Sequence, residues 1–297
     1  MYRSTVLASF IMMLPMVCPA QGYTIQFNKG VNQKVVSGWA SSLDKIDDTS
    51  SKTYIRKKSG GKDELHRVGH RDVIVWIPET TDVTQDFILV FWFHGHYGYV
   101  PHRTFQDRTL KQFVPLARSK NFVVVIPEMP WSIHAKTPTK RNSLVWTKPG
   151  DFLKFVTQVK GILSEHMNDT HPTGTTLGTI DYRVVGHSAG GSTIKRLGMT
   201  GDLCKISPSM VVWSDSSYGT WFDLAWKGCL KDNNIPTKVF VKKWGPPYRS
   251  IMRFVNDNGG VPKKAGLNIM LHPWTHKSIG DNIVKLSGLL EDHHEVD

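Results

Sequence analysis

The sequence predicts an α/β fold with a mostly parallel central sheet and helices on both faces. Runs rich in β-branched and aromatic residues alternate along the chain with amphipathic stretches long enough for helices. The strand runs are almost continuously apolar, as in FILVFWF and FVVVIP. That composition is typical of strands covered on both sides, so we expect helices on both faces of the sheet.

Strands and helices are expected in alternation over most of the chain. Strands are predicted at residues 73–77, 87–93, 122–126, 182–185, 210–213, 238–241 and 267–271, and helices at 106–119, 151–166, 188–199, 219–230, 248–256 and 277–290. Right-handed crossovers place the carboxyl ends of parallel strands along one edge, where sites in such sheets form. Residues 131–150, rich in Pro, Lys and Thr, are expected as an insertion over that edge.

The first twenty residues, MYRSTVLASFIMMLPMVCPA, have the pattern of a secretory signal peptide. Arg3 precedes an apolar run over residues 6–17, and small residues stand before the expected cleavage point. We therefore predict a signal peptide at 1–20, one domain at 21–297, and a secreted or periplasmic protein. The apolar run is too short for a transmembrane helix, and no later stretch approaches about 20 apolar residues.

Export changes how the cysteines are interpreted. Removal of the leader leaves Cys204 and Cys229 in an oxidising compartment, where two thiols most often pair. The alternative is two separate buried cysteines that behave as small apolar residues. A bridge would fasten both ends of the segment between them.

The charge balance points to anionic partners or surroundings. Lys and Arg number 37 against 25 Asp and Glu, a formal net charge of +12. The basic residues are scattered without a nucleic-acid-binding motif, and no glycine loop of the phosphate-binding or dinucleotide kind is present. We therefore expect no nucleic acid partner and no cofactor.

The stretch DYRVVGHSAGGS carries the chemistry. Its GHSAG segment, residues 186–190, matches G-x-S-x-G and stands after a predicted strand and before a predicted helix. Flanking glycines suit a tight turn in which a Cβ would collide with neighbouring backbone. This context predicts Ser188 as an exposed nucleophile.

On this motif the chain resembles the α/β-hydrolase superfamily, over residues 73–290. The resemblance implies an acid and then a histidine further along the chain. The later of the two following strands, where most relatives carry the acid, ends KVFVKKWGPPY without a carboxylate, whereas the earlier ends VVWSDSSYG. Asp215 is therefore the expected acid. Its alternative role is a helix N-cap or turn residue.

The last strand ends NIMLHPWTHKSIG and offers two histidines. His276, just before the final helix, is favoured as the base over His272 at the strand tip. Their spacing could also suit zinc, but Pro273 argues against a shared helix face and no third ligand is evident, so no metal is expected. The resemblance further implies an oxyanion hole from the backbone N–H groups of Ala189 and of His96 in the HGHYG loop.

These residues imply a serine hydrolase that cleaves carboxylic esters through an acyl-enzyme. Aromatic residues near the strand ends suit a cleft for sugar rings, aromatic acyl groups or a polyester. The expected substrate-binding residues are Tyr97, Trp131, Trp213, Tyr218 and Trp274. Secretion and basic charge favour a polymeric or cell-envelope ester. The alternatives are an amidase acting on cell-wall peptides and a non-catalytic glycan-binding protein on the same scaffold.

Overall fold

A computed structural model describes most of the chain. Four strands near the amino terminus are described by their backbone, and the description is complete over residues 73–95, 109–127, 129, 146–262 and 266–291. No helix among these residues is long and apolar enough to cross a membrane.

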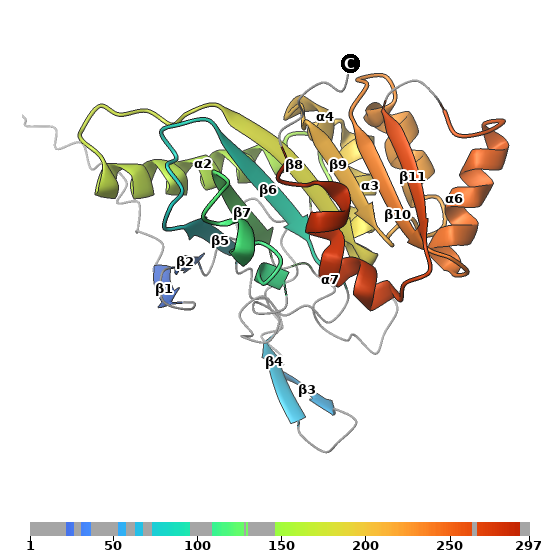
Figure 1. Cartoon of the computed structure of the whole chain (residues 1–297), viewed down its shortest axis with the longest axis horizontal. Helices are drawn as coiled ribbons and strands as arrows, with labels where there is room; N and C mark the ends of the chain where they lie inside the picture. Colours follow the sequence, from blue (N-terminus) through green and yellow to red (C-terminus); the bar gives the residue numbers. More distant parts are fainter. Residues whose placement is uncertain are drawn as a thin grey trace, which may run out of the picture.

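A sheet of nine strands forms the centre of the described structure (Figure 1). In spatial order it contains β1 (Gly22–Gln26), β2 (Val31–Val36), β5 (Val73–Pro78), β7 (Phe122–Pro127), β6 (Phe87–Phe93), β8 (Ile180–His187), β9 (Met210–Ser214), β10 (Thr237–Lys242) and β11 (Leu267–His272). All pairings from β7 to β11 are parallel, and those of β1, β2 and β5 are antiparallel. β3 (Thr53–Lys57) and β4 (Asp63–Arg67) form a separate hairpin.

Helices cover both faces of the sheet. α7 (His276–Ser287) lies in front of it in Figure 1, while α2 (Asp151–Thr170) and α3 (Gly191–Thr200) lie behind. The remaining described helices are η1 (Val114–Leu116), η3 (Ser188–Gly190), α4 (Asp202–Lys205), α5 (Trp221–Ala225), η4 (Trp226–Leu230) and α6 (Pro246–Asp257).

Alternate residues of the buried strands feed two separate cores. In β6, Leu89, Phe91 and Phe93 join the cluster that includes α2, α3 and α6. Ile88, Val90 and Trp92 join the cluster on the α7 side. Side chains of a strand alternate between faces, so a continuously apolar run is what two covered faces require. The predicted α/β class with a mostly parallel sheet is confirmed.

Two sequence predictions of secondary structure need correction. The helix predicted at 106–119 is helical in its described part only at 109–110 and then passes into turns and η1. Pro115 within it has no N–H to donate, which opposes a continuous helix. β1 and β2 extend the sheet with strands that precede residue 73, where the first strand was predicted.

Candidate active site

Ser188 is the first residue of η3, at a sharp turn directly after β8. Its φ of 53° is in the left-handed region, which residues other than glycine rarely adopt. The flanking glycines allow close packing around it: a Cβ on Gly190 would lie 2.0 Å from the Phe93 carbonyl oxygen, and one on Gly186 would lie 2.6 Å from Ile194 Cδ1. The strained backbone conformation is therefore that of Ser188. Because Gly186 and Gly190 have no Cβ, β6 and α3 can pack closely around the turn.

The loop after β6 packs directly on this serine. A Cβ on Gly95 would lie 2.8 Å from Ser188 Cβ and 3.3 Å from Ser188 Oγ. The buried His94 ring fixes the loop, because its Nε2 accepts the Met129 N–H at 2.9 Å and its Nδ1 therefore donates to the Gly95 carbonyl at 2.7 Å. His96, the predicted oxyanion residue, lies outside the described residues. Ala189 is buried in the first turn after Ser188, where backbone N–H groups lack intrahelical partners.

Asp215 follows β9 and reaches across to the end of β10. Its backbone N–H donates to the Phe240 carbonyl at 2.7 Å, and its Oδ1 accepts the Lys242 N–H at 2.9 Å. The residue is only 2% exposed and has a φ of 47°. The N-cap of α5 is Thr220, so Asp215 does not have the capping role considered as its alternative. Although Asp215 follows β9 in the chain, its carboxylate thus lies at the carboxyl end of β10.

His276 is the first residue of α7 and pairs with this carboxylate. Its Nδ1 lies 2.6 Å from Asp215 Oδ2. Because a carboxylate only accepts, Nδ1 carries a proton, and the neutral tautomer that this contact selects has its lone pair on Nε2. The Thr275 side chain caps α7 by accepting the Ser278 N–H at 3.1 Å. His272 lies at the end of β11, where its ring packs between Phe240 and Trp274.

Two contacts bring Ser188 together with this pair. The Tyr218 hydroxyl lies near both Ser188 and Asp215. Burial raises the pKa of the Tyr218 phenol, the nearby Ser188 hydroxyl lowers it, and the Asp215 charge raises it. In addition the ring of His187, the residue before the serine, stacks on His276 with centroids 4.7 Å apart. Ser188, which follows β8, therefore lies close to the Asp215–His276 pair beyond the ends of β9 and β11.

The site combines a strained serine turn between a strand and a helix, a mostly parallel sheet, and an aspartate and a histidine that follow in the chain and pair beside the turn. This combination is distinctive. The protein has the α/β-hydrolase fold.

Similarity to known proteins is found among solved structures. No protein-family model matches the sequence, and no curated protein is similar to it. The structure is similar to an S-formylglutathione hydrolase from Agrobacterium tumefaciens, with 11% identity, a TM-score of 0.49, and coverage of 90% of this chain and 98% of the other. It is also similar to a feruloyl esterase module from Clostridium thermocellum, with 12% identity, a TM-score of 0.45, and coverage of 94% and 93%. Identities this low leave the reaction of an α/β-hydrolase fold to be argued from its site.

Sequence reasoning missed His187 as part of the site. Its Nδ1 lies 3.0 Å from the Ser214 carbonyl oxygen, and a Cβ on Gly280 of α7 would lie 2.5 Å from its Cε1. The ring therefore fills the space between the end of β9 and the first turns of α7, against one face of His276. Only the three-dimensional structure brings α7 onto this residue, so the sequence carries no signal for the stack.

The predicted substrate-binding residues have different outcomes. Trp213 is completely buried, and its ring packs against Phe222 at 5.3 Å, so the prediction that it lines a cleft is wrong. Tyr218 lies near Ser188, and Trp274 is partly exposed two residues before His276. Tyr97 and Trp131 lie outside the described residues.

A disulfide joins Cys204, in α4, to Cys229, in η4. The bridge closes a segment with a sequence separation of 25 that contains Asp215 and Tyr218. A crosslink of this length restricts the unfolded chain more than the folded one. Among the described residues, no three His, Cys, Asp or Glu side chains gather as metal ligands.

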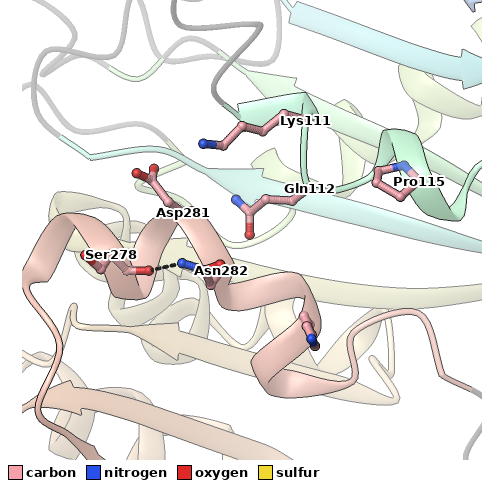
Figure 2. Close-up of a pocket in the computed structure, with 7 residues that line it drawn as sticks. Lys111, Gln112, Pro115, Ser278, Asp281 and Asn282 are labelled. Atoms are coloured by element: carbon pink, nitrogen blue, oxygen red, sulfur yellow. Dashed lines mark hydrogen bonds between the residues drawn. The ribbon is translucent and has the colours of Figure 1, made fainter.

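α7 is also fastened from outside the site, beside a polar pocket of about 420 Å³ (Figure 2). The Gln112 side chain donates to the Gly280 carbonyl at 2.9 Å and accepts the Val284 N–H at 3.2 Å. These two groups are an i, i+4 pair of the helix. Gln112 thereby ties the helix that begins at His276 to the segment before η1. The lining of this pocket contains none of the predicted site residues.

Proposed function

We propose that the protein is a secreted serine hydrolase that cleaves carboxylic esters, with Ser188 as nucleophile, His276 as general base and Asp215 as the acid. The observation that carries the proposal is the 2.6 Å contact between His276 Nδ1 and the buried Asp215 carboxylate, beside a serine held in a left-handed turn. The contact orients the imidazole and selects the tautomer whose Nε2 can accept a proton.

The reaction then follows in two halves. His276 Nε2 takes the Ser188 proton as Oγ attacks the ester carbonyl, and the Asp215 carboxylate stabilises the imidazolium that forms. The tetrahedral intermediate carries a negative oxygen, which the N–H groups of Ala189 and His96 are proposed to receive. The alcohol leaves with the proton from His276. Water, activated by the same imidazole, hydrolyses the acyl-enzyme.

Export is part of the proposal. The leader-like residues 1–20 support it, and so does the disulfide between Cys204 and Cys229, because such bonds persist in oxidising compartments. An exported, basic enzyme suits a polymeric or cell-envelope ester better than a cytosolic metabolite.

Labelling with a fluorophosphonate probe, together with hydrolysis of short p-nitrophenyl esters, tests the chemistry. We expect the wild type to react with the probe and to cleave the esters, and the Ser188→Ala variant to do neither. A variant that keeps full esterase activity, or a wild type that neither labels nor cleaves, contradicts the proposal. Release of new amines from peptidoglycan, with esters untouched, would favour an amidase instead.

A further inference from the structure

Two tryptophans are exposed at the edge of the sheet that carries the site. Trp244 is 70% exposed and Trp274 is 39% exposed, whereas Trp76, Trp146, Trp213 and Trp226 are buried. Large exposed aromatic side chains on a soluble protein mark binding surfaces when they gather at one place. The question is therefore whether these two gather, and what they fit.

Their positions match across two neighbouring strands. Lys242 of β10 pairs with His272 of β11, and the ladder continues with the Lys243 N–H donating to the His272 carbonyl at 2.8 Å. Trp244 and Trp274 each follow two residues after this pair. Both therefore lie beyond the carboxyl ends of adjacent parallel strands. The Lys242 N–H also donates to Asp215, so the strand end that Trp244 follows holds the proposed acid.

The local structure holds these rings outward. Trp244 has a φ of 65°, which is unusual for a bulky residue and is retained where the surroundings enforce it. Its ring packs on Tyr248 at 5.7 Å, and Lys243 Nζ lies 5.5 Å from its centroid. Trp274 packs on His272 at 5.2 Å. We call Trp244, Tyr248 and Trp274 the aromatic platform.

The two segments that carry the aromatic platform are basic. Segments 237–256 and 266–280 contain no Asp or Glu. Their exposed cations nearest the strand ends are Lys242, Lys243, Arg249 and Lys277. Flat aromatic faces suit the apolar faces of pyranose rings, and the surrounding cations suit carboxylates on those rings.

We propose that the aromatic platform binds the sugar rings of an acidic, uronate-containing polysaccharide next to the reaction centre. That the polymer carries the ester cleaved at Ser188 rests on the proposed function, whereas binding itself does not. The aromatic residues supply ring stacking, and the lysines supply attraction that weakens with salt.

Binding of the full-length Ser188→Ala protein to polygalacturonate, measured by affinity electrophoresis and calorimetry, tests the proposal without turnover. We expect retardation at low salt, and affinity lower by about five- to tenfold in each of Trp244→Ala and Trp274→Ala. Trp244→Phe should keep most of the affinity. The matched control is Met199→Ala, which removes a side chain that is 57% exposed and lies about 16 Å along α3 from Ser188. Thermal unfolding establishes that each variant is folded.

Comparison polymers separate the two contributions. A neutral glucan bound as tightly as polygalacturonate would overturn the role of charge, and polyglutamate bound as tightly would overturn ring stacking. Absence of polygalacturonate binding, or tryptophan variants that bind like their parent, would also overturn the proposal. Such a result, with Ser188 of the wild type still labelled by fluorophosphonate, would leave the hydrolase function standing.

Discussion

Replacement of Asp215 by asparagine tests the acid at its unusual place after β9. The carboxylate accepts two N–H groups at once, from His276 at 2.6 Å and from Lys242 at 2.9 Å. Asparagine of the same shape offers one oxygen and one NH₂ group, so one of the two donors must then face another donor. If the NH₂ group faces His276, the imidazole loses its reactive tautomer; if it faces the Lys242 N–H, the side chain loses the bond that holds it in place.

The expected loss follows from the charge that His276 acquires in the reaction. A unit charge about 4 Å from a carboxylate is stabilised by about 4 kcal/mol at an effective dielectric constant of about 20. Loss of this interaction alone slows the reaction by about 10³-fold. Loss of the reactive tautomer adds to it, so we expect kcat to fall about 10³- to 10⁴-fold.

The assay is kcat on a short p-nitrophenyl ester, with Asp202→Asn as the matched control. Asp202 is also completely buried and accepts backbone N–H groups, from Gly150 at 2.7 Å and Phe152 at 3.2 Å. Both variants should lose about 1–3 kcal/mol of unfolding free energy in urea, but only Asp215→Asn should lose kcat. The reasoning is refuted if Asp215→Asn keeps more than about a tenth of kcat, or if both variants lose it equally.

Two further predictions concern the alkaline stability of the fold and the packing of the serine turn. Burial raises the pKa of Tyr218, so above about pH 10 the unfolded chain releases this proton before the folded one and stability falls as pH rises. Urea unfolding from pH 9 upward should therefore show a smaller alkaline loss for Tyr218→Phe than for wild type, and equal losses would contradict the stated cause. Gly190→Ala would place Cβ 2.0 Å from a β6 carbonyl oxygen and should abolish labelling of Ser188. The control is Gly161→Ala, whose added methyl group meets open space on the exposed side of α2. It should raise the free energy of unfolding by about 1 kcal/mol. Labelling of the Gly190→Ala variant would show that the turn tolerates the methyl group.

The sequence predicted those parts of the fold and site that depend on local pattern. Apolar runs such as FILVFWF located β5, β6, β7 and β9, because both faces of those strands are buried. The Ser188 turn was visible because its strand, glycines and helix are contiguous. Asp215 could be placed because the end of the following strand contains no carboxylate.

The remaining features depend on contacts between distant segments. The anchoring of Asp215 by Lys242 uses a backbone N–H, which every residue except proline provides, so no residue type announces it. The stack of His187 on His276 requires α7 to pack across β8 and β9. Trp213 is different, because strand alternation places it on the same face as the buried Val211, and that signal predicts the core rather than a cleft.

The link between Asp215 and the backbone of β10 has a consequence for biosynthesis. The strained serine turn needs only β6, β8 and the start of α3, all of which precede Asp215 in the chain. The carboxylate acquires its second N–H partner only when β10 pairs with β9, and the imidazole arrives only with the strand after that. A partly synthesised or partly folded chain would therefore display a serine without its proton acceptor. Hydrolytic competence becomes a property of the finished sheet, and its appearance during refolding should follow docking of the last two strands rather than formation of the turn.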